Sequence, residues 1–260
     1  MTLHEALGLG ETELVAFVGA GGKKTAMARL ASTGARENRR VGYTTTTHMP
    51  PPEFPVVVSP AMDVPATEKY ESLVADSSRG SAVAFGSQWV EEPDRAPEKL
   101  RGYAPADIDT LSATGAFDWV LVKADGARRR EFKAPADHEP ALPNSSTVVV
   151  VVASVKAVGE PLSESIVHRP ERVTAVTGLD AGAEITPEAM GSVIASTDGG
   201  LKGVPDGCSV VVMVNKAEST SEQSTARSVL QSAFERSDRF SGGLITSFRD
   251  ESCLAVSADR

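Results

Sequence analysis

The chain has 260 residues, a formal net charge of −9 and 41% hydrophobic residues. A surface this acidic does not attract a phosphate backbone, which argues against a nucleic-acid partner. No apolar stretch approaches the ~20 residues that a bilayer requires, and the N-terminus lacks the features of a signal peptide, so we expect a soluble, cytoplasmic protein without a membrane partner. The two cysteines fit no metal-ligand spacing and indicate no disulfide framework.

Short apolar runs predict seven buried strands. Most runs are continuous rather than alternating, which is typical of a parallel sheet covered on both faces. They lie at residues 14–18, 41–46, 55–59, 81–85, 119–124, 147–154 and 209–215. Helical patterns lie between several of them, at residues 24–36, 65–76, 107–114, 185–196 and 219–237. This alternation predicts a layered α/β fold, with a mostly parallel sheet and helices on both faces, in one P-loop NTPase-like domain over residues 1–260.

Two segments stand out within this pattern. The helix near 185–196 has a start signal, with Thr186 as N-cap and Pro187 in the first turn. Residues 126–146 are polar and proline-rich and show no periodic face. A loop of that length inside a compact domain is usually functional or mobile.

A glycine-rich stretch, FVGAGGKKTAM, joins the first strand to the first helix. Such a turn suits a phosphate, because backbone N–H groups converge there and the helix N-terminus adds positive potential. The P-loop pattern places its lysine six positions after the first glycine, whereas Lys23 and Lys24 follow Gly19 by four and five. The pattern leaves open which lysine holds phosphate, and a glycine-rich turn with two solvated lysines is the alternative. The predicted nucleotide loop comprises Gly19, Ala20, Gly21, Gly22, Lys23, Lys24 and Thr25.

An aspartate follows the strand at 119–124. Asp125 at the carboxyl end of a central strand, beside a phosphate loop, is typical of a nucleotide enzyme that binds Mg²⁺ or a metal-bound water. We therefore expect Thr25 and Asp125 to hold Mg²⁺, and Lys23 and Asp125 to take part in catalysis. A simple Asp-Gly turn is the alternative.

The strand at 209–215 ends in Asn-Lys-Ala-Glu. In GTP-binding proteins, Asn-Lys-x-Asp after a strand recognises guanine, because the carboxylate accepts hydrogen bonds that only this base offers. The sequence predicts that Asn215, Lys216 and Glu218 hold the base. Glu218 is one methylene longer than the aspartate of that motif, so the choice between GTP and ATP stays open.

Five segments together resemble the YqeC-like selenium-dependent hydroxylase accessory proteins. They are GAGGKKT, TTTTH at 44–48, KADGARRREFKAPADHEPALP at 123–143, HRPE at 168–171 and NKAE at 215–218. The resemblance runs over roughly residues 14–248, and the phrase ADGA…KAPADHEP is its most specific part. The loop of that family is similar to Gly-x-Gly-Gly-Lys-Thr, which implies that Lys23 is the phosphate lysine and puts Lys24 where a hydroxyl is usual. The glutamate of the family's strand-end motif is Lys123 here.

This resemblance implies an accessory role in the maturation of selenium-dependent molybdenum hydroxylases. The partner would be such a hydroxylase or the proteins that mature its cofactor, and a molybdopterin-type cofactor or labile selenium would be handled. No chemistry on selenium follows from the residues, since neither cysteine lies in a site-like setting.

Further polar residues are candidates around the loop. Thr46 and His48 follow the second strand at the same sheet edge, where they could contact a γ-phosphate and position water. Threonines that merely favour a strand, and charges that are merely solvated, are the alternatives. The candidates for a second-substrate site are Arg128, Lys133, His138, Glu139, His168 and Arg169.

Three functions fit these residues. The first is a Mg²⁺-dependent NTPase that uses GTP or ATP to drive a maturation step, with catalysis by positioning and charge stabilisation. The second is a nucleotide-dependent binding module that docks on a client enzyme with negligible turnover. The third is a nucleotidyl or phosphoryl transferase that modifies a pterin cofactor, with residues 126–146 as the acceptor site.

Overall fold

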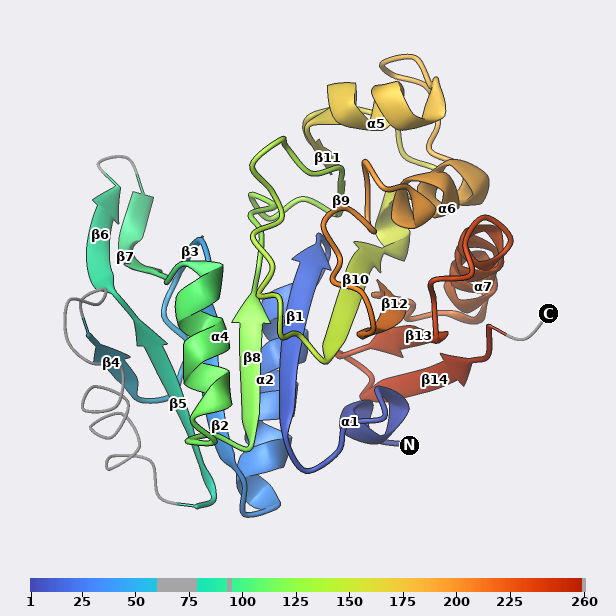
Figure 1. The fold of residues 1–260 in the computed structure, drawn as a ribbon. Coiled ribbons are helices and arrows are strands. Elements are labelled where there is room, and N and C mark those ends of the chain that lie inside the picture. Colours follow the sequence, from blue (N-terminus) through green and yellow to red (C-terminus); the bar gives the residue numbers. More distant parts are fainter. Residues whose placement is uncertain (60–78, 93–94, 259–260) are drawn as a thin grey trace.

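A nine-stranded sheet forms the centre of the computed structural model, which describes residues 1–59, 79–92 and 95–258 (Figure 1). The strand order is β14-β13-β12-β10-β1-β8-β2-β5-β4, and neighbouring strands are parallel except for β13 and β14. The strands are β1 (Glu13–Gly19), β2 (Arg40–Thr45), β4 (Val56–Val58), β5 (Ser81–Gly86), β8 (Trp119–Lys123), β10 (Val148–Ser154), β12 (Ser209–Asn215), β13 (Gly242–Ser247) and β14 (Ser252–Val256).

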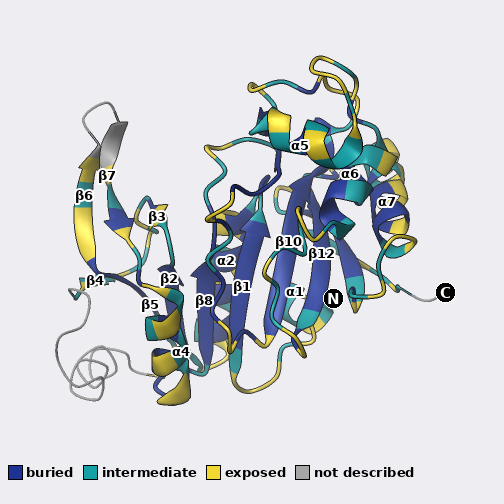
Figure 2. Cartoon of the chain, turned by 45° about the horizontal axis from the view of Figure 1, so that its top comes forward, coloured by how far each residue is buried: buried dark blue, intermediate teal, exposed yellow. Residues whose placement is uncertain are grey.

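Helices cover both faces of this sheet. One face carries α1 (Leu3–Ala6) and α2 (Lys23–Arg36), and the other carries α4 (Pro105–Ala113), α6 (Pro187–Ala195) and α7 (Thr220–Phe234). Along β1, Val15 and Phe17 pack toward α2, whereas Ala16 and Val18 pack toward the opposite layer. Because the side chains of the central strands meet a helix layer on either face, β8 and β10 are buried along their whole length and β1 is buried except at its two ends (Figure 2).

Smaller elements lie at the carboxyl edge of the sheet. β3 (His48–Met49), β6 (Gln88–Glu92) and β7 (Arg95–Arg101) form an antiparallel three-stranded sheet. β9 (Phe132–Lys133) pairs in parallel with β11 (Val167–His168), which leads into α5 (Pro170–Thr177). The short 3-10 turn η1 (Val155–Ala157) follows β10. These pieces bring chain from distant parts of the sequence onto the ends of β1, β8 and β10.

The structure confirms the layered α/β fold, and each of the seven predicted strands is present. The predicted N-cap Thr186 accepts a hydrogen bond from Ala189 N at 3.2 Å. The helix predicted at 65–76 lies outside the described residues. Within the described residues, none of the helices combines the length and the apolarity that crossing a bilayer requires. The P-loop NTPase-like assignment stays a prediction.

Residues 126–146 are more ordered than their composition indicates. This segment contains β9 and buries Ala134, Ala136 and Leu142 in the layer that also holds α6 and α7. It crosses the carboxyl ends of the central strands, because Ser154 N donates to Glu131 O at 3.0 Å and Ala141 N donates to Ala124 O at 3.0 Å. The segment is therefore part of the packed structure and forms one wall of the candidate site.

Candidate functional site

The glycine-rich loop between β1 and α2 depends on backbone conformations that glycine adopts freely. Gly19, Gly21 and Gly22 have φ values of +90°, +83° and +143°. A Cβ on Gly21 would lie 2.5 Å from Ser154 Cβ, and a Cβ on Gly22 would collide with the amide of Asn215. The loop is thus held tightly against the ends of β10 and β12, with no room for side chains on its inner side.

The outer side of the loop presents unsatisfied donors. Gly22 is the N-cap of α2 and supplies no side-chain cap. Within the described part of the chain, the backbone N–H groups of Gly21, Gly22, Lys23, Lys24 and Thr25 have no hydrogen-bond acceptor. The first N–H groups of a helix need an external partner, and an anion satisfies them together with the helix dipole.

Lys23 turns back into the protein beneath this loop. Its side chain is only 5% exposed, and its Nζ lies 2.6 Å from Oδ1 of Asp125 and also donates to Gly19 O. Gly19 N donates to Oδ2 of Asp125 at 2.8 Å. Asp125, the residue predicted at the strand end, therefore holds both the first glycine and the lysine of the loop.

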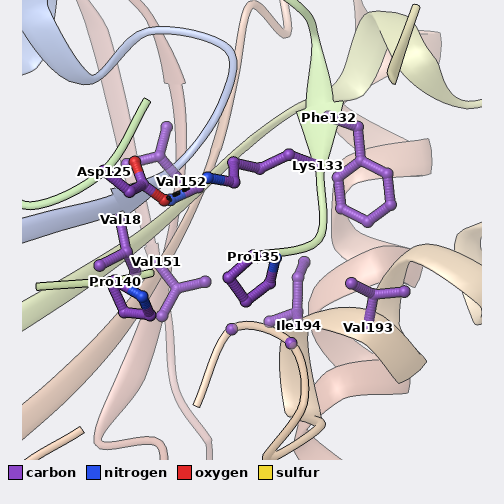
Figure 3. Close-up of a pocket in the computed structure, with 13 residues that line it drawn as sticks. Val18, Asp125, Phe132, Lys133, Pro135, Pro140, Val151, Val152, Val193 and Ile194 are labelled. Atoms are coloured by element: carbon purple, nitrogen blue, oxygen red, sulfur yellow. Dashed lines mark hydrogen bonds and ion pairs between the residues drawn. The ribbon is translucent and has the colours of Figure 1, made fainter. Parts of the chain in front are cut away.

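A second lysine reaches the same carboxylate from β9. Lys133 Nζ lies 3.1 Å from Oδ2 of Asp125 and 2.8 Å from Oε2 of Glu139, and it points toward Asp125 in Figure 3. Arg169, the N-cap of α5, contacts the same Glu139 oxygen at 2.6 Å. Lys23, Lys133, Asp125, Glu139 and Arg169 thus form one chain of alternating charges, which we call the charge cluster.

Burial and pairing shift the pKa values within the charge cluster. Burial alone would raise the pKa of Asp125, but the positive charges of Lys23 and Lys133 outweigh it and lower that pKa. Burial lowers the pKa of Lys23, and the charge of Asp125 offsets part of this effect. For Glu139, burial opposes ionisation, yet the charge and hydrogen bond of Lys133 lower its pKa to about 2. Both carboxyl groups are therefore ionised at neutral pH.

The pocket behind the charge cluster is small. Asp125 and Lys133 form its polar side, and Phe132, Val193 and Ile194 are among its apolar walls (Figure 3). Its volume of about 20 Å³ has room for roughly one water molecule. A nucleotide does not fit there, so the outer side of the loop is the surface on which a phosphate chain would lie.

The Asn-Lys-Ala-Glu segment lies beside the loop, but its first two side chains already have partners. Asn215 Nδ2 donates to Gly21 O at 2.9 Å, and its Oδ1 accepts from Thr246 Oγ1 at 2.9 Å. Lys216 pairs with Glu131 at 2.6 Å. Asn215 therefore anchors the glycine-rich loop. Contact with a base stays a prediction, as it does for Glu218, which lies 3.6 Å from Lys156.

Thr46 and His48 do not lie at the charge cluster. Thr46 Oγ1 donates to Ala141 O at 2.8 Å, and both residues line a separate groove beside the β3–β7–β6 sheet. β8 lies between β1 and β2, so this groove is about 10 Å from the loop, two strand spacings away. Their predicted role on a γ-phosphate stays untested, and a contact would have to bridge that gap.

The predicted second-substrate residues divide into three groups. Lys133 and Glu139 are buried in the charge cluster, where their partners are protein groups, and Arg169 pairs with Glu139. Arg128 and His138 are exposed and available to a ligand. His168 pairs in register with Lys133, and burial together with the charge of Arg169 lowers its pKa to about 4, so its imidazole is neutral at pH 7.

The matches to known proteins cover most of the residues described above. A protein-family model described as "YqeC protein" matches residues 15–171, which include the loop, Asp125, the charge cluster and the groove threonines. The chain belongs to the YqeC family. A relative from Escherichia coli (strain K12), named "Uncharacterized protein YqeC", is 33% identical over 228 residues, covering 86% of this chain and 84% of that protein.

Sequence reasoning on this YqeC-family chain missed Lys123 as a possible site residue. Its Nζ donates to Thr47 Oγ1 at 2.7 Å and to His48 O at 3.0 Å, and the residue is 7% exposed. Burial, followed by the nearby charge of Lys23, lowers the pKa of Lys123 to about 7. A lysine that ends a strand of apolar residues was the available signal, because the last residue of a buried strand rarely faces bulk water.

The charge cluster leaves Asp125 no free position for a divalent ion. Thr25 is exposed in the first turn of α2, and its hydroxyl suits a cation bound beside a phosphate. Asp125 does not fit as a direct ligand, because Lys23, Lys133 and Gly19 N surround its oxygens. Among the described residues, no three His, Cys, Asp or Glu side chains gather as a metal-binding group.

Proposed function

We propose that this YqeC-family protein binds a nucleoside triphosphate, GTP or ATP, on the outer side of the β1–α2 loop. It would hydrolyse the nucleotide, or use it, to assist the maturation of selenium-dependent molybdenum hydroxylases. The maturation role rests on the family resemblance of the motifs. The nucleotide role rests on the site, and the phosphate chain is the part of the ligand that the loop addresses.

The observation that carries the proposal is the run of five N–H groups at residues 21–25 without an acceptor in the described chain. Phosphate oxygens would satisfy these donors, and the positive end of α2 adds to the attraction. Lys23 lies directly beneath, so its ammonium supports negative charge on the loop even while it is paired with Asp125. The exposed Lys24 and Arg128 extend the positive surface.

Mg²⁺ would be held chiefly by the nucleotide's own phosphates and the Thr25 hydroxyl. When bound, it would neutralise charge on the phosphates. Asp125 would act on the other side of the loop, by fixing Gly19 and Lys23 in position. This assignment makes Asp125 a positioning residue rather than a direct metal ligand.

A second candidate is a nucleotide-dependent binding module with negligible turnover. The enclosure of Asp125 by two ammonium groups favours it, because a carboxylate so engaged does not accept a proton from an attacking water. Glu139 is engaged in the same way. In this case nucleotide binding would alter the surface around the loop and thereby the docking of a client protein.

The test is a titration of the full chain with non-hydrolysable GTP and ATP analogues, with and without Mg²⁺. We expect Lys23→Ala to lose binding and Lys24→Ala to weaken it only a few-fold, because Lys23 lies under the loop whereas Lys24 points to solvent. An equal loss in both variants would mean that the two lysines act as one cationic patch. Absence of binding to the wild type would refute the proposal.

Turnover separates the candidates. Release of many equivalents of phosphate per protein supports the hydrolase. Tight binding with release of one equivalent or less supports the binding module. Incorporation of nucleotide or phosphate into an added pterin would instead support a transferase.

A further inference from the structure

A groove of about 560 Å³ opens where the end of β2, the β3–β7–β6 sheet and the start of α4 meet. Pockets for small molecules have volumes of about 300–1,000 Å³. In Figure 1 the three-stranded sheet stands beside α4 and beyond the end of β2. The groove is separate from the small pocket behind Asp125 and shares no lining residue with it.

Three polar side chains form a row on one wall of this groove. His48 on β3 and Gln88 on β6 are the cross-strand partners of Arg101 on β7. Side chains of directly paired residues project from the same face of a sheet, with Cβ atoms about 4.5–5.5 Å apart. All three residues are exposed and line the groove. A guanidinium flanked by an imidazole and an amide can direct several N–H groups at one oxyanion.

Two further features add positive potential near the groove, whose lining contains Arg101 and Asp107. The N-terminus of α4 opens into it at Ala104, and Asp107, the acidic residue of the lining, accepts a hydrogen bond from Ala104 N at 3.2 Å. Beneath the floor, Lys123 donates to Thr47 Oγ1. Lys123 forms no ion pair with any residue that the structure describes, and with a pKa of about 7 its protonated fraction places positive charge below the groove.

Main-chain contacts hold the walls of the groove in place. Gly102 N donates to Thr47 O at 2.8 Å, which ties β7 to the end of β2. Ser87 N donates to Arg101 O at 2.8 Å, and Ser87 Oγ donates to Gly102 O at 3.0 Å. A Cβ on Gly102 would collide with Thr45 O, so the two segments touch there. The groove is therefore formed before any ligand arrives.

We propose that this groove binds the oxyanion group, a phosphate or a carboxylate, of a second small-molecule substrate. Arg101 provides the fork of donors, and His48 and Gln88 flank the same group. Thr47, whose hydroxyl accepts a hydrogen bond from Lys123, lines the groove beside them. The rest of the molecule would extend along the groove toward Tyr103.

The groove lies near the β1–α2 loop, where the nucleotide is proposed to bind. β1, β8 and β2 are consecutive strands, so the floor of the groove and the loop lie about 10 Å apart at the same edge of the sheet. That the ligand is a co-substrate of the nucleotide rests on the proposed function. The binding of an oxyanion in the groove does not, and it is tested separately.

The test is calorimetric titration of the full chain with inorganic phosphate and with malonate, in wild type, Arg101→Gln, Gln88→Glu and Lys23→Ala. Arg101→Gln removes a charged hydrogen-bond donor, and Gln88→Glu adds a negative charge that repels the ion. Each substitution should weaken binding of the ion about tenfold or more. Lys23→Ala should still bind the ion, because the groove does not include Lys23. Arg227→Gln is the matched control, since it removes the same charge from the exposed surface of α7.

The outcomes are distinct. Stronger binding of phosphate identifies a phosphate-bearing substrate, and stronger binding of malonate identifies a carboxylate. If Lys23→Ala removes all binding and Arg101→Gln changes nothing, the ion sits on the phosphate loop and the groove proposal is overturned. Failure of both ions to bind at millimolar concentration also overturns it. Because no nucleotide is added, failure here leaves the nucleotide proposal to its own test.

Discussion

Lys23 and Asp125, separated by more than a hundred residues in the chain, meet with Nζ and Oδ1 only 2.6 Å apart beneath the glycine-rich β1–α2 loop. Lys133 reaches the other oxygen of the same carboxylate at 3.1 Å. One aspartate therefore compensates two buried ammonium groups and also accepts the N–H of Gly19. Loop conformation, charge balance and the end of β8 are coupled through this single residue.

Replacement of that carboxylate tests the coupling. Asp125→Asn should lower the free energy of unfolding by about 3–5 kcal/mol, because Lys23 would remain buried without its counter-ion and Lys133 would keep only Glu139. Urea denaturation at pH 7 measures the change. Asp198→Asn is the control, since Asp198 is exposed. A loss below about 1 kcal/mol would show that the two lysines find other partners at little cost.

Protonation of Glu139 should make the stability of the protein fall in acid. Its pKa is about 2 in the folded chain against 4.5 for an ordinary glutamate, so its ion pairs contribute fully above pH 4.5. That contribution is lost as the pH falls from 4.5 toward 2, because the unfolded chain binds the proton first. We expect the stability difference between wild type and Glu139→Gln to shrink by roughly 1–3 kcal/mol over this window. A constant difference between pH 5 and pH 3 would contradict this assignment.

Gly21 separates the effect of backbone strain from that of crowding. Gly21→Ala combines a φ of +83° with a Cβ 2.5 Å from Ser154 Cβ, whereas Gly8→Ala has a φ of +66° and open space around its Cβ. Gly8→Ala should cost about 1 kcal/mol of stability, and Gly21→Ala about 1–3 kcal/mol more. Thermal unfolding of both variants checks the difference. Similar losses in the two would mean that Ser154 moves away freely.

Lys123 should make the free energy of unfolding depend on pH above about 7, and not in acid. Its pKa is about 7 when folded and 10.5 in an ordinary lysine, so below pH 7 both states are protonated and the cost of burying the charge is present in full. Between pH 7 and 10.5 the unfolded chain binds more protons, and the folded state gains stability as the pH rises. Lys123→Met buries no charge, so it should be more stable than the wild type at pH 6.5. This difference in the free energy of unfolding should shrink by about 2–3 kcal/mol between pH 6.5 and 9.5.

Urea denaturation at those two pH values gives the result. Thr47→Val is the matched control, since it removes the hydroxyl partner of Lys123 but keeps the ammonium group. Its stability should change with pH as that of the wild type does. If Lys123→Met and the wild type have parallel profiles, the ammonium is solvated and does not titrate near neutrality.

The sheet could be predicted from local composition because its signal is local. Runs such as residues 147–154 and 209–215 are too apolar for any position but a strand buried on both faces, and they became β10 and β12. β13 was missed, since its two leading glycines weaken the strand pattern of Gly242–Ser247. β14 was missed too, because as an antiparallel edge strand it exposes Leu254.

The candidate site was predictable in its parts and not in its arrangement. The glycine loop, Asp125 and Asn215 were visible as strand-end motifs, and they do converge, because the carboxyl ends of parallel strands meet at one edge. Lys133 and Glu139 were candidates for a ligand and are instead partners of the protein itself. A residue type shows which contacts are possible, whereas burial decides which are made.

The amino-acid sequence by itself determined the α/β layers, the glycine-rich loop and the family, because hydrophobic runs and motif spacing are properties of neighbouring residues. Only the tertiary structure decided that Lys23 is paired beneath the loop, that Asn215 anchors it, and that Arg101 stands between His48 and Gln88. These relations join residues far apart in the chain. Their energies depend on distance and on exclusion of water, and both are set by how the layers pack.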